Sequence, residues 1–453
     1  MPQRNCTKIK ANVVSPNKRI TLPITMEQYQ EIVGDHRAYR EWVDEMIVQY
    51  PELFPKEIVG GYSLHDERAS EKMEGMRLRR ICLKVCDSKG KKQVFTLAPS
   101  GVMPYFVGRT DEVEKGLFLR RFDVPFWALT YVFGQDDNYW YRMENHFGRY
   151  EIVQTVVKDP EKLPLHLLAD EKITWLNGEK VVVATTVGED CVLGVSVALN
   201  ADEENLTEAY QHFKEEAQAL KAGYAPETVN TDGWAATQRA WLNLFPMIIL
   251  IECFLHAFIK IRERGKHLKE LFHQISQQVW DVYRAADAAS FRTKAEELRL
   301  WAEKNTTGYV LEAVRKLCTK TERFVLAYDY PHAHRTSNML DRHMNPMARW
   351  LDSTRFFHGH WDAAERSMRA WALLHDFGPY CPRAKIAQSY SSPAHKLNGF
   401  VYHQNWLHNL LIATSLSGVK PCPQTPAEPG KFEDSAVALM AFLTLSFCSA
   451  AVS

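Results

Sequence analysis

The sequence lacks an excess of charge of either sign, because 55 Lys and Arg residues balance 55 Asp and Glu residues. This balance excludes a protein that binds nucleic acid through a uniformly basic surface. Any phosphate binding would depend on local patches, and the sequence has two. Seven basic residues and one acid lie between Arg77 and Lys92, and five more basic residues lie between Lys260 and Lys269.

Paired cysteines and an apolar leader are also missing. The nine cysteines contain no CxxC pair, which argues against a disulfide framework and a four-thiolate zinc site and favours a reduced, cytoplasmic protein. The polar residues 1–19 predict no signal peptide. Residues 435–453 are uncharged and apolar, and their length is borderline for a membrane span. We expect them to be an atypical tail without a membrane role.

A chain of 453 residues exceeds what one hydrophobic core usually supports, so we expect several domains. Helical spacing of apolar residues predicts a helical N-terminal region over residues 1–75. Residues 76–160 are predicted to hold a β-hairpin and two helices around a turn. An α/β domain follows over residues 161–418, and a Pro-rich and apolar tail occupies residues 419–453.

The predicted hairpin pairs residues 79–85 with residues 91–98 across a polar turn. Its basic side chains indicate either a surface facing phosphate or an ordinary solvated strand face. The candidates for DNA contact are Arg79, Arg80, Lys91 and Lys92.

The two helices cover residues 124–133 and 136–147, with Gly134 at the break and Asp136 as the cap of the second helix. This spacing is similar to a helix-turn-helix, in which the second helix, here carrying Arg142, enters the major groove. Two short helices around a glycine also occur in proteins that do not bind DNA.

From residue 163 the pattern changes to strands and helices in alternation. Three strands, the first two joined at Asn177-Gly178, precede a helix, a strand that ends at Asp232, a second helix, and a strand that leads into a basic helix. This order is that of an RNase H-like fold, a mixed sheet with parallel central strands. Residues 265–325 are predicted to be a helical insertion.

Three aspartates punctuate these elements. Asp170 is predicted at the end of the first strand, Asp232 at the end of the fourth, and Asp341 on a helix after the insertion. Hydrolysis of a phosphodiester without a covalent intermediate needs two divalent ions, and Mg²⁺ prefers carboxylate oxygens. A lone acid at a strand end is usually a helix cap, so the prediction depends on the set. Glu171 would point to the opposite face of its strand and is left out.

Several motifs resemble those of prokaryotic DDE-type insertion-sequence transposases and of the related Mutator-like and hAT elements. They are Asp232-Gly-Trp, Cys253-Phe-Leu-His256 before a basic helix, Arg335-Thr-Ser-Asn-Met-Leu-Asp341, and Ala169-Asp170-Glu171-Lys172 with Thr185-Thr186. The likeness spans roughly residues 95–418.

The resemblance implies a DNA transposase that binds two Mg²⁺ or Mn²⁺ ions through Asp170, Asp232 and Asp341. It implies that His256 lies near the scissile phosphate and that Cys253 supports it. Lys260, Arg262 and Arg264 would hold DNA, and the protein would act on terminal inverted repeats and target DNA as a homodimer or larger assembly at the nucleoid.

The third acid is Asp where those families usually have Glu, and the final 35 residues or so do not resemble them. The main alternative is therefore a transposase-derived protein that binds DNA without cutting it. A second alternative is a zinc hydrolase that uses two histidine clusters, His332-Ala-His334 and His358-Gly-His360.

Overall fold

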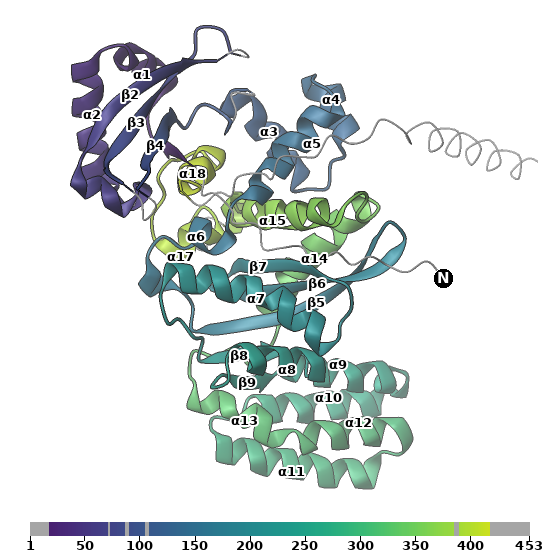
Figure 1. Cartoon of the computed structure of the whole chain (residues 1–453). Helices are drawn as coiled ribbons and strands as arrows, with labels where there is room; N and C mark the ends of the chain where they lie inside the picture. Colours follow the sequence, from purple (N-terminus) through teal and green to yellow (C-terminus); the bar gives the residue numbers. More distant parts are fainter. Residues whose placement is uncertain (1–17, 71–72, 87–89, 105–107, 385–388, 417–453) are drawn as a thin grey trace, which may run out of the picture. The chain divides into compact units, whose positions relative to one another are not determined.

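The computed structural model describes residues 18–416, apart from 71–72, 87–89, 105–107 and 385–388. The turn of the predicted hairpin and the predicted tail over residues 419–453 lie largely or wholly outside these residues. The described part of the chain contains a four-stranded and a five-stranded sheet, together with helices that pack on both (Figure 1). The expected mixed α/β architecture is confirmed.

The smaller sheet has the order β1-β4-β3-β2, and its first strand runs parallel to β4 while the others pair antiparallel. Helices α1 and α2, capped by Thr25 and Asp35, share a hydrophobic core with it. The bounds are β1 Arg19–Leu22, α1 Met26–Val33, α2 His36–Gln49, β2 Tyr62–Ala69, β3 Arg77–Cys86 and β4 Lys92–Pro99.

The predicted hairpin is confirmed by the pairing of β3 with β4. The region expected to be helical up to residue 75 also supplies two strands of this sheet, and β2 pairs with β3 across the expected boundary. Residues 18–99 therefore pack as one layer of helices on one sheet. Helical periodicity could not reveal this, because β2 is largely polar and has no clear alternation of apolar residues.

A group of helices follows the smaller sheet: α3 Thr110–Arg120, α4 Phe126–Phe133, α5 Asp137–His146 and α6 Ile152–Val156. The expected turn between two helices is confirmed. Gly134 adopts a φ of 74°, and Asp136 caps α5 by accepting a hydrogen bond of 2.6 Å from the backbone N–H of Tyr139.

The larger sheet has the order β7-β6-β5-β8-β9. In this sheet β5, β6 and β7 pair antiparallel, and β8 and β9 continue the sheet parallel to β5. Asn177 and Gly178 have φ angles of 52° and 81°, as a two-residue hairpin turn requires. The strands are β5 His166–Leu176, β6 Glu179–Gly188, β7 Cys191–Ala198, β8 Thr228–Thr231 and β9 Ile249–Glu252.

Helices cover both faces of this sheet, which explains why β6 and β7 are buried along most of their length. One pair is α7 Glu203–Leu220 and α8 Ala235–Leu244, and the other is α14 Asn338–Ser353 and α15 Trp361–Phe377. The shorter α17 Pro393–Asn398 and α18 Trp406–Ala413 pack against α15.

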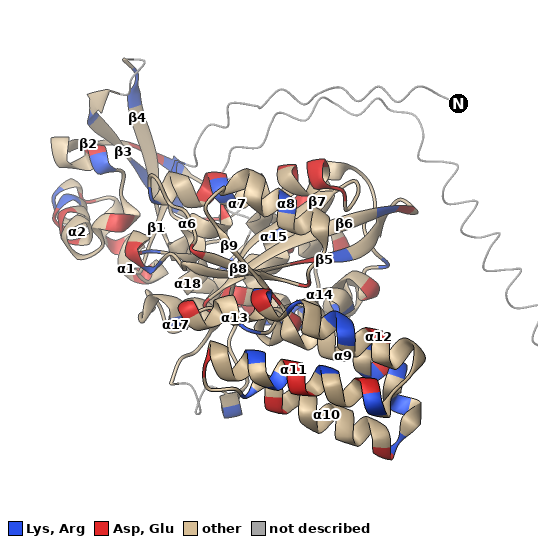
Figure 2. Ribbon diagram, turned by 90° about the horizontal axis from the view of Figure 1, so that it is seen from below, with Lys and Arg blue, Asp and Glu red and all other residues tan. Residues whose placement is uncertain are grey.

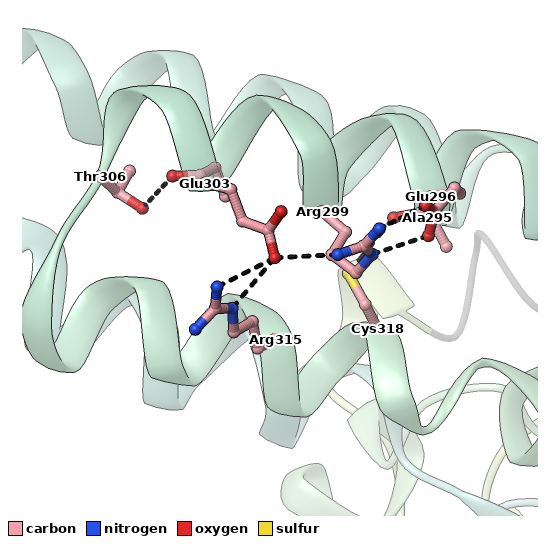
Figure 3. A network of polar contacts seen from close by, with 8 residues as sticks. Ala295, Glu296, Arg299, Glu303, Thr306, Arg315 and Cys318 are labelled. Atoms are coloured by element: carbon pink, nitrogen blue, oxygen red, sulfur yellow. Dashed lines mark hydrogen bonds and ion pairs between the residues drawn. The ribbon is translucent and has the colours of Figure 1, made fainter.

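The helical insertion has its own hydrophobic core and begins one helix earlier than expected. It consists of α9 Phe254–Gly265, α10 Glu270–Tyr283, α11 Ala288–Asn305, α12 Gly308–Thr319 and α13 Thr321–Asp329. Polar contacts also join α11 to α12, where Glu303 accepts bonds of 2.8 Å from Arg299 and 3.0 Å from Arg315 (Figure 3). Exposed ion pairs of this kind contribute little, so the apolar core is the main cause of stability.

Among the described residues, no helix combines the length and apolar character that crossing a bilayer requires. The apolar segment over residues 435–453 lies outside them.

Candidate active site

The strand register brings Asp170 and Asp232 next to each other. Strands β5 and β8 are parallel neighbours in which Leu168 pairs with Asn230, so both aspartates lie two residues beyond the same pair. Neighbouring strands are about 4.8 Å apart. Asp170 was expected at a strand end but lies within β5, because pairing with β6 continues this strand to Leu176.

Asp341 joins these two residues from the first turn of α14, as expected for an acid on a helix. Burial raises the pKa of Asp170 to about 6. The charges of Asp232 and Asp341 raise it further, whereas His256 lowers it. The other three side chains that the sequence singled out as catalytic therefore lie within electrostatic reach of Asp170.

His256 is held at the start of α9 by Cys253. The thiol of Cys253 is the main cause that raises the pKa of His256 to about 9, and Asp170 and Asp232 raise it as well. The thiol and the two aspartates therefore favour the protonated form of the imidazole. Its buried Nδ1 atom has no hydrogen-bond partner among the described residues.

Cys253 also connects α9 to the third acid. Its Sγ atom lies 3.3 Å from Ser337 Oγ and accepts a bond of 3.2 Å from the Ser337 N–H. Ser337 Oγ in turn donates to Asp341 Oδ2 at 3.2 Å. The sequence analysis gave Cys253 a supporting role and did not consider Ser337, although it precedes the acid in the motif quoted above.

The turn after Asp232 is shaped by Gly233, which has a φ of 88°. A side chain at this position would overlap the carboxylate of Glu252, which is 2% exposed and lies at the end of β9. Lys320 and Arg323 of the α13 region pair with that carboxylate. The insertion thereby holds Glu252 against the turn that presents Asp232.

Glu171 faces away from this cluster, as the alternation of a strand predicts. Its Oε1 atom accepts bonds of 2.7 Å from Tyr210 on α7 and from Thr237 on α8. Burial raises its pKa to about 7. Glu171 therefore joins the sheet to two helices, while the adjacent Asp170 points toward the acidic cluster.

Comparison with known proteins gives no family. No family model matches the chain, and no curated protein matches it.

The donor set suits a divalent cation in chemistry and in charge. Three carboxylates supply hard oxygen ligands, and their mutual repulsion appears in the raised pKa of Asp170. As the side chains lie, the described residues contain no group of three or more His, Cys, Asp or Glu that could together hold a metal ion.

The histidine clusters give no support to a zinc site. His166 and His332 rings lie 6.3 Å apart, and burial lowers the pKa of His334. His358 and His360 are exposed residues on the loop before α15.

Two of the predicted DNA contacts lie in β3 and have protein partners. Arg79 is 1% exposed, donates a bond of 2.9 Å to Val33 O, and pairs with Glu67. Its burial argues against a phosphate contact. Arg80 is partly exposed and forms a surface ion pair with Asp66, so its contact with DNA stays a prediction.

The remaining candidates are exposed. Lys91 and Lys92 lie at the start of β4, and Arg142 lies on α5. Lys260, Arg262 and Arg264 are exposed along α9, where the ribbon in Figure 2 is blue at basic positions. Arg264 also donates a long bond of 3.4 Å to Tyr309 O of α12.

Proposed function

We propose that the protein is a DNA transposase whose RNase H-like domain hydrolyses phosphodiester bonds and transfers DNA strands. The observation that carries the proposal is the parallel register of β5 and β8, which aligns Asp170 with Asp232, together with the electrostatic coupling of both to Asp341 and His256. The strand order β7-β6-β5-β8-β9 supports it, since this is the order expected for that fold.

Two Mg²⁺ or Mn²⁺ ions bound by Asp170, Asp232 and Asp341 would supply activation of the attacking oxygen and stabilisation of the leaving oxygen. The remaining work falls to the chain. His256, whose Nδ1 has no partner among the described residues, would donate a hydrogen bond to a phosphate oxygen in its protonated form. Ser337 fixes the rotamer of Asp341, and the pair Gly233 and Glu252 fixes the turn of Asp232.

The test is cleavage of duplex DNA taken from both sides of the reading frame, in Mg²⁺ or Mn²⁺. We expect Asp232→Asn to cut more than about a hundredfold more slowly than the wild type, since even indirect partners of a metal ion cost 10–100-fold. The control is Asp202→Asn, because Asp202 caps α7 away from the cluster and Asn caps equally well.

Equal cutting by the wild type and Asp232→Asn would overturn the catalytic assignment. Tight DNA binding without cutting by either protein would instead identify a transposase-derived DNA-binding protein. The presence of Asp341, where the families that the sequence resembles usually have Glu, favours keeping this second candidate. Assembly as a dimer follows from the proposed function, because two DNA ends have to be joined in one complex.

A further inference from the structure

A cavity of about 180 Å³ lies between α5, the C-terminal end of α14 and the start of α15. Its walls are mainly aromatic. Trp350 and Phe357 are almost fully buried, whereas Tyr141 is 39% exposed and lies in an edge-to-face contact with Phe126 at 6.0 Å between ring centroids. The aromatic side chains come from segments more than 200 residues apart in the sequence, so no local sequence pattern predicts the cavity.

One polar atom in this lining has no partner. Asn145 donates a bond of 2.7 Å from Nδ2 to Tyr141 OH, while its buried Oδ1 atom accepts no hydrogen bond in the described part of the chain. A buried acceptor without a donor is unfavourable. A ligand that brings an N–H or O–H group to Asn145 Oδ1 would complete the hydrogen bonding of this side chain.

The charged residues of the lining already satisfy each other. Arg120 donates to Glu144 at 2.5 Å and to Val124 O at 2.7 Å, and its guanidinium stacks on Phe126. The carboxylate of Glu144 therefore neutralises the charge of Arg120 in the cavity wall. A neutral planar ligand is thus favoured over a phosphate or a carboxylate.

The backbone that closes the cavity is strained and is held from outside. Arg355 and Phe356 have φ angles of 53° and 71°, which cost non-glycine residues about 1–3 kcal/mol each. The next residue, Phe357, donates a bond of 2.9 Å to Trp175 O and accepts one of 3.0 Å from the Asn177 N–H. The β5–β6 hairpin therefore keeps Phe356 and Phe357 in the wall.

The volume limits the ligand to one ring system. A protein cavity of about 150 Å³ lined by apolar side chains can hold benzene. A six-membered heteroaromatic ring with an N–H donor fits both this size and the Asn145 acceptor. Cytosine, through its amino group, and thymine, through its ring N–H, meet this description.

We propose that the cavity holds one unstacked pyrimidine base of a nucleic acid strand, with an N–H of the base donating to Asn145 Oδ1 and the ring packed between Tyr141 and Trp350. That the base belongs to a nucleic acid strand, rather than to a free nucleoside, rests on the proposed function. Trp350 lies nine residues along α14 from Asp341, so the base site is about 14 Å from the acidic cluster along the helix axis.

The experiment measures binding of the full chain to a labelled single strand of deoxycytidine by fluorescence anisotropy, in EDTA so that cleavage plays no part. The comparison strand carries abasic nucleotides throughout. We expect the wild type to bind the intact strand about tenfold more tightly, since base stacking on aromatic side chains contributes about 1–3 kcal/mol.

Two variants assign the preference to the cavity. Asn145→Leu removes the acceptor at similar volume, and Ser367→Leu fills the cavity from α15 without touching Asn145. Each is expected to bind the two strands equally, with affinity for the abasic strand unchanged. Asn138→Leu is the matched control, because Asn138 is exposed on the same helix outside the lining.

Equal affinity of the wild type for the intact and abasic strands would overturn the proposal, and so would a full preference retained by both variants. If Asn145→Leu fails to fold, Ser367→Leu alone decides. Displacement of the strand by free cytidine would assign recognition to the base itself, and a preference without displacement would assign it to a base presented by a strand. If the wild type prefers the intact strand but does not cut duplex DNA in Mg²⁺ or Mn²⁺, the proposed nuclease activity is refuted and the proposed base site is retained.

Discussion

Gly233→Ala is the substitution from which the structure predicts the most specific effect. An alanine at a φ of 88° has a left-handed backbone cost of about 1–2 kcal/mol. Its Cβ atom would also overlap the carboxylate of Glu252. That carboxylate cannot simply swing away, because Lys320 and Arg323 hold it. Overpacking of this kind costs about 1–3 kcal/mol, so the total loss is about 2–5 kcal/mol.

Gly178→Ala is the matched control for the backbone cost. Gly178 has a similar φ of 81°, and a Cβ atom there would meet nothing within 4 Å. Urea unfolding of both variants should therefore show Gly233→Ala to be more destabilising by about 1–3 kcal/mol, which is the overlap with Glu252 alone.

The double variant Gly233→Ala with Glu252→Ala tests the cause. Removal of the carboxylate should relieve the overlap, so the two changes should cost less together than the sum of their separate effects. Cleavage by Gly233→Ala should fall as well, because the turn that carries Asp232 is displaced. Equal destabilisation by Gly233→Ala and Gly178→Ala, or strict additivity in the double variant, would refute the reasoning.

Two further predictions concern stability. Burial raises the pKa of Glu365 to about 7, so its ionisation destabilises the fold as pH rises from about 4.5 through 7. Glu365→Gln, which keeps an acceptor for Val197 N–H, should gain up to about 3 kcal/mol relative to the wild type between pH 4 and pH 8; a pH-independent difference in urea unfolding would contradict this. Arg79→Met should lower stability by about 1–3 kcal/mol, because Val33 O loses a buried donor and Glu67 keeps only the more distant Arg77, whereas Lys92→Ala should change it by less than about 0.5 kcal/mol. Similar losses of stability for these last two variants would show that Arg79 is not structural.

Features set by a few neighbouring residues could be predicted from the sequence. The Asn177-Gly178 turn, the break at Gly134 and the cap at Asp136 all depend on local backbone preferences, and all three are confirmed. The order of strands in the larger sheet was predictable for the same reason, since β6 and β7 are mainly apolar runs between turn signals.

Features set by tertiary packing could not be predicted. The basic residues of β3 alternate between faces, but only the presence of α1 and α2 decides that Arg79 is buried. Asp170 was expected at a strand end, and the long pairing with β6 extends the strand past it. The unpaired acceptor of Asn145 depends on aromatic side chains that the sequence separates widely.

Helix α9 carries more exposed basic residues near the acidic cluster than α4 and α5 do. If the protein binds DNA as proposed, the strand would therefore approach the cluster along α9. Helix α5 begins with Asp136 and Asp137 and exposes Arg142 as a basic side chain, and α4 has no charged residue at all. Helix α9 starts beside the cluster, and Lys260 lies one turn beyond His256 on the same side of the helix. Because phosphate contacts depend on Lys and Arg, the start of the insertion is better suited to guide a strand than the helix-turn-helix-like region. The turn between α4 and α5 is thus correct as local structure, and the DNA-reading role first assigned to α5 is the weaker part of that interpretation.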